Sequence, residues 1–188
     1  MSTIKQSRSL PSSPNDRVID CGKSYGEEKE KLTCCDKKEV CAKAKAQNDP
    51  IKENQKKDRR GRIDTTSDAY DTARNVVGPG EQSNFRKDFM ALTAMAPGDG
   101  WTEDDFKAEF LAECRFEEWK KTRSIDNLDA DHVIELQFGG APGWRNLKFT
   151  SSRVNRMFGA SASHYDEGKH TAIRPHGNCD CSNTAKCA

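Results

Sequence analysis

The chain has no apolar run near the ~20 residues that a membrane-spanning helix requires, and residues 1–20 lack the apolar centre of a secretory signal. If the chain leaves its cell, we therefore expect a larger parent protein to carry it as a tail. Only 34% of the 188 residues are hydrophobic and 7% are aromatic. The core must be small, and such cores often need cross-links, a metal or a partner. The length suits one domain, with or without an appendage.

The chain also lacks a large net charge, since its formal net charge at pH 7 is +1. This balance conceals a net +6 over residues 1–62, −9 over residues 63–141 and +4 over residues 142–188. A nucleic-acid enzyme needs only a basic face beside its site. Basic residues of the last block are candidates for phosphate contacts, with an ordinary solvated surface as the alternative. They are Arg145, Lys148, Arg153 and Arg156.

No C-x₂-C pair occurs among the eight cysteines, which counts against a zinc knuckle or ribbon. Cys114 falls within a predicted apolar helix stripe, where we expect a buried free thiol. The other seven are candidates for disulfides, with free thiols and then structural zinc as alternatives. These seven are Cys21, Cys34, Cys35, Cys41, Cys179, Cys181 and Cys187. Because seven is odd, at least one of them would stay unpaired.

Periodicity and capping signals predict helices before residue 100. The predicted helices cover residues 26–47, 69–77 and 84–95. Asn48-Asp49-Pro50 should end the first of them. Ser83 is the plausible cap of the third, in which Phe85 and Phe89 share one face.

A further helix is predicted to begin at Thr102, which has capping-box spacing with Asp105. Its apolar residues keep helical period as far as Cys114, and basic residues up to Arg123 suit its C-terminal end. We therefore expect one continuous helix with its stripe in the core.

Next come a strand, a glycine-rich loop, a second strand and a short helix. The strand segments are residues 128–134 and 146–149. Ser151 or Ser152 should cap the helix, and Gly159 should close it.

The most informative segment is this strand–loop–strand–helix region, because it contains Asp131 and His132. Asn146 follows His132 by 14 residues and Asn155 follows it by 23. A carboxylate and an amide oxygen can hold a hard cation, while an imidazole can take a proton from water. Folding the helix over the hairpin would bring Asp131 and Asn155 together around one ion. Asp129 is a rival ligand, although we expect a cap or turn role for it.

With these residues in place, the segment resembles the HNH/endonuclease VII superfamily, whose ββα-metal finger has a metal-binding Asp and a catalytic His as neighbours. The stretch DADHVIELQFGGAPGWRNLKFTSSRVNRMFG is most similar to HNH toxin domains of bacterial polymorphic toxins and type VI secretion effectors. The resemblance covers about residues 125–165, so most of the chain lies outside it. A lone Asp-His pair is a weak signal, but the pair followed by GG, NL and Asn at fitting spacings is fairly specific.

The resemblance implies a role for each matching residue. Asp131 and Asn155 would each give an oxygen to one divalent cation, and His132 would be the general base. Asn146 would bond the backbone across the loop and so orient His132. Oxygen ligands without His or Cys favour Mg²⁺, or Mn²⁺, over Zn²⁺. If His164 folded back onto the ion, that preference would weaken.

The sequence therefore predicts an α+β, mainly helical small domain built around a ββα-metal (HNH) finger. Residues 1–62 would form an N-terminal linker and helical, cysteine-containing arm, and residues 63–188 would form the nuclease toxin domain. The expected activity is metal-dependent hydrolysis of phosphodiester bonds in DNA, with RNA as the alternative substrate.

The toxin resemblance also implies a biological setting. A secretion apparatus would deliver the domain, through a larger parent protein, into the cytoplasm of a target bacterial cell. A cognate immunity protein is the expected partner, and no membrane association is expected. Two other interpretations stay open: an HNH endonuclease of a phage or mobile element, and a non-catalytic Cys/His-rich module that binds nucleic acid or protein.

Overall fold

A computed structural model gives the architecture of most of the chain. It describes residues 16–21, 32–58, 80–95, 101–135, 140–141, 143–162, 172–176, 179 and 181. Within these ranges, five α-helices and two two-stranded sheets form an α+β fold, which confirms the predicted class. None of the described helices is both long and apolar enough to cross a membrane.

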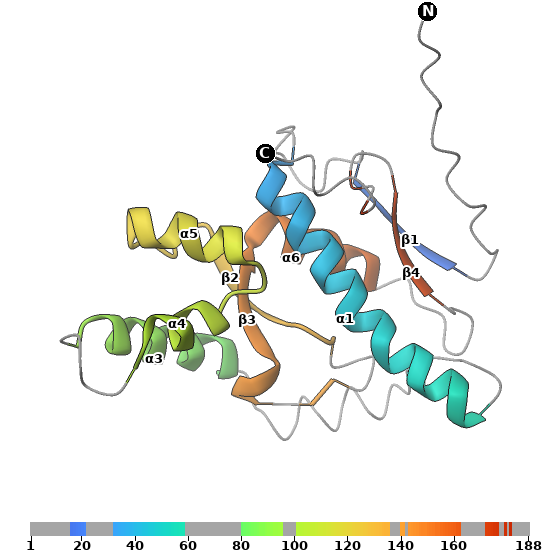
Figure 1. The fold of residues 1–188 in the computed structure, drawn as a ribbon, viewed down its shortest axis with the longest axis horizontal. Coiled ribbons are helices and arrows are strands. Elements are labelled where there is room, and N and C mark those ends of the chain that lie inside the picture. The colour runs from blue at the N-terminus through green and yellow to red at the C-terminus, as the bar shows by residue number, and fades with distance from the viewer. Residues whose placement is uncertain are drawn as a thin grey trace, which may run out of the picture.

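The elements follow one another in a mixed order along the chain. They are β1 (Asp16–Asp20), α1 (Cys34–Asp58), α3 (Glu81–Thr93), α4 (Glu103–Ala108), α5 (Glu113–Thr122), β2 (Leu128–His132), the 3₁₀ helix η2 (Trp144–Asn146), β3 (Leu147–Ser151), α6 (Ser152–Ala162) and β4 (Ala172–His176). In Figure 1, β2 and β3 lie in the middle of the molecule, with α3, α4 and α5 on one side and α1, β1 and β4 on the other.

Each sheet has two strands. β2 runs antiparallel to β3, with Leu128 opposite Ser151 and His132 opposite Leu147. β1 runs parallel to β4, although the two strands come from opposite ends of the chain. The β2–β3–α6 order matches the strand–strand–helix order predicted for this region.

Two hydrophobic cores flank the β2–β3 hairpin. The first is aromatic and joins α3, α5 and the hairpin through residues such as Phe89, Trp119 and Phe149. The second joins β1, α1, α6 and β4, and includes Val40 and Met157. The described part of the predicted N-terminal arm therefore shares a core with the C-terminal half of the chain.

The predicted end of the first helix at Pro50 is wrong, because α1 continues through this residue to Asp58. Tertiary contacts explain the difference. The side-chain amide of Asn48 donates a hydrogen bond to the carbonyl of Ile173 and accepts one from its N–H, both at 2.8 Å. These bonds fasten the middle of α1 to β4, and such packing overrides a local stop signal.

The helix predicted from Thr102 to Arg123 is broken. Its capping box is confirmed, since Thr102 and Asp105 exchange both side-chain-to-backbone bonds. The helix ends at Ala108, however, and α5 starts at Glu113. The intervening residues pair with β3 instead: the N–H of Leu111 donates to the carbonyl of Phe149 at 2.9 Å. This β-type pairing satisfies backbone groups that a continuous helix would have used internally.

Other helix boundaries also differ from the prediction. α3 has Gly80 at its N-cap, so Ser83 lies inside the helix, whereas the burial of Phe85 and Phe89 is confirmed. Ser151 caps α6 as expected, because its hydroxyl accepts a bond from the N–H of Arg153. Gly159 does not close α6, which runs to Ala162. The helix predicted over 69–77 lies outside the described residues.

Disulfides tie α1 and β1 to the rest of the chain. Three pairs join two described residues each: Cys21–Cys179, Cys35–Cys114 and Cys41–Cys181. Cys34 is disulfide-bonded as well, and Cys187 lies outside the described residues. The free thiol predicted at Cys114 is therefore wrong, because α5 packs beside the first turn of α1 and brings Cys114 to Cys35.

Candidate functional site

The candidate site lies at the end of β2, where side chains alternate between the two faces of the strand. Leu128 and Ala130 point into the aromatic core, and His132 shares their face. Asp129 and Asp131 share the opposite face, which α6 and α1 cover. The predicted base and the predicted metal ligand therefore leave the strand on opposite sides.

His132 pairs with a carboxylate that sequence reasoning missed. Its Nε2 lies 3.3 Å from Oε2 of Glu81, the first residue of α3, and its side chain is 11% exposed. If Nε2 carries the hydrogen that Glu81 accepts, Nδ1 keeps its lone pair. The pair then has the geometry of an oriented base, with one ring nitrogen fixed and the other able to take a proton.

Asn146 makes the cross-loop bonds expected of it. Its carbonyl oxygen accepts a bond from the N–H of Ile134 at 3.0 Å, and its amide donates to the carbonyls of Ile134 and Ala141 at 2.8 and 2.9 Å. The backbone N–H of Val133 also donates to the carbonyl of Asn146. These bonds hold the chain that immediately follows His132.

Gly140 completes this clamp by its lack of a side chain. A Cβ at this position would lie 2.0 Å from the carbonyl oxygen of Ile134 and 2.8 Å from the amide nitrogen of Asn146. Both distances are shorter than non-bonded atoms tolerate. The glycine-rich loop therefore needs Gly140 because the backbone of residue 134 approaches it closely.

Asp131 is buried and forms an ion pair with Lys43 of α1. The Lys43 ammonium also lies 2.8 Å from Oε1 of Glu135. Burial raises the pKa of the Asp131 carboxyl to about 6; Lys43 opposes this rise and Glu135 adds to it. Burial lowers the pKa of Lys43, but the two carboxylates raise it further, so the ammonium keeps its charge.

Asn155 contacts Asp129 rather than Asp131. Its amide donates to one carboxylate oxygen of Asp129 at 2.9 Å, and the hydroxyl of Ser152 donates to the other at 2.8 Å. Asp129 thus anchors the start of α6 to β2 through side-chain bonds from within the strand, and the cap or turn role expected for it is wrong. Asp131 and Asn155, the two expected ligands, have different partners in this arrangement.

These contacts bear on whether a divalent cation fits. The oxygen donors of Asp131, Asp129 and Asn155 are of the kind that Mg²⁺ prefers. The described residues, however, contain no group of three or more His, Cys, Asp or Glu side chains placed to hold a metal. The Lys43 ammonium already occupies the Asp131 carboxylate, so this arrangement does not accept a second cation there. His164 lies outside the described residues.

The four candidate phosphate-binding residues have different surroundings. Arg145 and Arg156 are exposed. Lys148 lies 3.8 Å from Glu109, and Arg153 lies 3.3 Å from Asp36 of α1. Two of the four are therefore placed against carboxylates.

Two other charged residues of the site, Lys43 and Glu81, were not predicted from the sequence. They lie far from the motif, in segments whose charged residues are typical of an exposed helix surface. A periodic signal existed, because Asp36, Glu39 and Lys43 recur at helical intervals. Sequence alone could not separate that pattern from a solvated face, since buried and exposed charged stripes have the same spacing.

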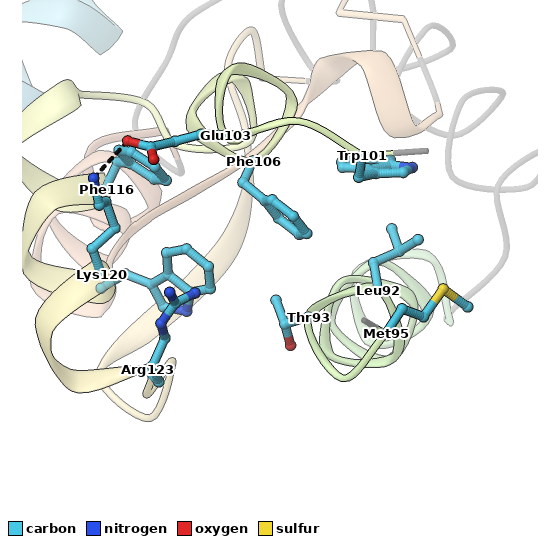
Figure 2. Close-up of a pocket in the computed structure, with 10 residues that line it drawn as sticks. Leu92, Thr93, Met95, Trp101, Glu103, Phe106, Phe116, Lys120 and Arg123 are labelled. Atoms are coloured by element: carbon cyan, nitrogen blue, oxygen red, sulfur yellow. Dashed lines mark hydrogen bonds and ion pairs between the residues drawn. The ribbon is translucent and has the colours of Figure 1, made fainter. Parts of the chain in front are cut away.

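A separate pocket of ≈ 470 Å³ lies among α3, α4 and α5. Figure 2 shows Trp101 and Phe106 facing Leu92 and Met95 across it, with Lys120 paired to Glu103 at one side. None of the predicted site residues lines this pocket. The pocket is therefore separate from the candidate site at the end of β2.

Comparison with protein-family models, curated proteins and solved structures gave no match to this chain. The function must be inferred from its own residues.

Proposed function

We propose that this chain is a metal-dependent endonuclease of the HNH type, which hydrolyses phosphodiester bonds in DNA. The observation that carries the proposal is the environment of His132 at the end of β2. Glu81 holds one nitrogen of its imidazole, and Asn146 clamps the turn that follows it. A histidine whose ring pairs with a carboxylate, and whose following backbone is clamped, suits a general base within the β2–β3–α6 order.

In the proposed reaction, Nδ1 of His132 takes a proton from the water that attacks the phosphorus atom. The Glu81 carboxylate stabilises the imidazolium that this transfer creates. The bond from phosphorus to the 3′ oxygen breaks, and the leaving oxygen takes a proton from a water molecule, which leaves 5′-phosphate and 3′-hydroxyl ends. Asn146 touches no reacting atom and acts as a positioning residue. When bound, Mg²⁺ or Mn²⁺ would neutralise charge on the phosphate and on the leaving oxygen.

The disulfides support the proposed role as an antibacterial effector. All seven cysteines among the described residues are disulfide-bonded, so none of them is left as a zinc thiolate. Disulfides form and persist in oxidising compartments, and a chain delivered to another cell passes through such space. We propose a larger parent protein as the carrier, the target-cell cytoplasm as the place of action and a cognate immunity protein as the partner.

Plasmid cleavage tests the activity. Oxidised and dithiothreitol-reduced protein is incubated with supercoiled DNA and Mg²⁺, and in parallel with structured RNA. We expect nicking and linearisation of DNA that EDTA abolishes, and a loss of about 10²–10⁴-fold in rate for His132→Ala. His176→Ala, an exposed histidine of β4, is the matched control and should cut like the wild type. Intact DNA and RNA in every condition, or full activity of His132→Ala, would overturn the proposal.

A further inference from the structure

Beside its apolar core residues Val40 and Ala44, α1 also buries a row of charged and polar side chains. We call it the charged face: Asp36, Glu39, Lys43 and Gln47, whose exposed fractions are 3%, 0%, 0% and 1%. Buried helix faces are normally apolar, because removing charges from water is unfavourable unless each one is paired. The amide of Gln47 has no hydrogen-bond partner among the described residues. The charged face is therefore held mainly by matching charges, whereas the apolar core contacts of α1 come from Val40 and Ala44.

The two carboxylates of the charged face occupy an anion site. The guanidinium of Arg115 donates to Glu39 through Nε at 3.0 Å and through Nη2 at 2.8 Å, and Nη2 also donates to Asp36 at 2.8 Å. The backbone N–H of Ser151 donates to both Glu39 oxygens at 3.2–3.3 Å. Arg153 donates to Asp36 at 3.3 Å. We call Arg115, Arg153 and the Ser151 N–H the anion site.

The anion site has the chemistry of a phosphate site. A planar guanidinium group can donate hydrogen bonds to two oxygens at once, and a backbone N–H at the start of a helix adds a further donor. Ser151 stands directly before α6, whose first residue is Ser152. A phosphodiester group offers the same kind of paired anionic oxygens as the carboxylates of Asp36 and Glu39.

One helical turn after Glu39 on the charged face, Lys43 places a positive charge among acidic side chains. The Lys43 ammonium sits on Asp131 and Glu135, and Asp131 leaves β2 on the face opposite His132. The face thus presents anions to the cationic donors of the anion site and a cation to Asp131 and Glu135. The charged face therefore has the charges of a phosphodiester with a bound metal ion. Its carboxylates correspond to the phosphate, and its ammonium corresponds to the metal ion.

We propose that α1 is a built-in competitor of the nucleic acid. Its carboxylates fill a phosphate-binding site, and its ammonium fills the cation position at Asp131. The identity of the displaced ligand as DNA rests on the proposed function. Metal and substrate bind only after α1 moves away, which accounts for the misfit between Asp131 and a cation in the arrangement described above.

Disulfides hold this competitor in place. Cys35–Cys114 joins α1 to α5, and Cys41–Cys181 joins it to the end of the chain. A dithiol transfers two electrons to each S–S bond, which becomes two thiols, and is itself oxidised to a cyclic disulfide. Cytosolic thiol systems carry out this reduction. The closed form then belongs to oxidising space, and the form that binds substrate belongs to a reducing cytoplasm.

The first experiment measures opening and DNA binding without cleavage. Full-length protein is compared in EDTA before and after reduction with dithiothreitol and alkylation with iodoacetamide. Amide hydrogen exchange reports on residues 34–58, and fluorescence anisotropy reports on binding of a fluorescein-labelled duplex. We expect faster exchange of α1 and an affinity gain of about tenfold or more, because a tethered competitor acts at an effective concentration in the mM range.

Two results would overturn the proposal. If α1 stays as protected after reduction as before, it is a fixed part of the core. If it loses protection while DNA affinity is unchanged, the anion site is no phosphate site. By contrast, tighter DNA binding without cleavage in Mg²⁺ would refute the nuclease function and leave the competitor role intact.

The second experiment tests the cation position with a metal alone. Binding of Mn²⁺ is followed by electron paramagnetic resonance for the wild type, Lys43→Met and Lys45→Met. Lys45 is the matched control, because it lies on the same helix but is 75% exposed. We expect no bound Mn²⁺ in the oxidised wild type or in Lys45→Met, and bound Mn²⁺ in Lys43→Met and in the reduced wild type. Equal Mn²⁺ binding by all four samples would contradict the proposal.

Discussion

The imidazole of His132 and the carboxylate of Glu81 come together from segments 51 positions apart in the sequence, with 3.3 Å between Nε2 and Oε2. One residue ends a strand and the other begins a helix, so the orientation of the proposed base depends on how α3 packs against β2. A catalytic role for this contact can be separated from a purely structural one.

Glu81→Ala should reduce the rate of DNA cleavage by about 10–100-fold with little change in KM, because the base loses the group that orients it. Single-turnover rates measure the effect. Asp88→Ala is the matched control, since Asp88 is an exposed acid on the same helix. A Glu81→Ala rate equal to that of the wild type, with His132→Ala inactive, would show that His132 works without this partner.

Asn146→Ala should lower the free energy of unfolding by about 2–3 kcal/mol. The substitution leaves the backbone N–H and carbonyl of Ile134 and the carbonyl of Ala141 without their partner, and unpaired buried groups are penalised. Urea unfolding followed by circular dichroism gives the value. Arg145→Ala, at the exposed neighbouring position, should stay within about 0.5 kcal/mol of the wild type.

Two glycines should respond to alanine in opposite directions. Gly140→Ala places a Cβ 2.0 Å from the carbonyl oxygen of Ile134, so the loop must shift and the protein should lose about 1–3 kcal/mol of stability. Gly159→Ala lies within α6 with nothing inside 4 Å of its added carbon. It should gain about 0.5–1 kcal/mol from helix propensity. Thermal unfolding of the two variants, side by side, decides whether close approach explains Gly140.

Asp36, in the first turn of α1, predicts a pH dependence of stability. Burial raises the pKa of Asp36, but bonds from Thr33 and the charge of Arg115 lower it more, so its net pKa lies below the ordinary 3.8. A carboxyl with a depressed pKa stabilises the fold above its unfolded pKa, and this contribution is lost as the pH falls through the folded value.

Asp36→Asn should therefore be less stable than the wild type at pH 7, and the difference should shrink as the pH falls below 3.8. Urea titrations from pH 2 to pH 7 measure both proteins. Asp88→Asn serves as the control for loss of an exposed negative charge. A difference that grows towards low pH would show that the acid destabilises the folded state.

Short-range signals in the sequence predicted much of the fold. The Thr102–Asp105 capping box, the buried pair Phe85 and Phe89, and the strand that carries His132 each depend on residues within a few positions of one another. Such patterns report local geometry directly. The bonding of Asn146 across its loop was expected from the family resemblance instead, and its partner Ile134 lies 12 positions away.

The contacts that could not be predicted join distant segments. Lys43 meets Asp131 from 88 positions away, and a lysine in a segment rich in Lys and Glu looks like a solvated charge. The break before α5 has the same origin, because Phe149 supplies the backbone partner that ends α4. Periodicity reveals which residues share a face, but only the assembled fold reveals what that face meets.

The parallel pairing of β1 with β4 has a consequence for the order of assembly. Asp16 lies opposite Ala172, so this sheet cannot form until β4 has been synthesised. Contacts across such long sequence separations form late in folding. The hairpin and its aromatic core lie entirely between residues 80 and 158 and can be complete earlier. On the ribosome, α1 is synthesised before the hairpin, yet the β1–β4 sheet that packs beside α1 is completed after it.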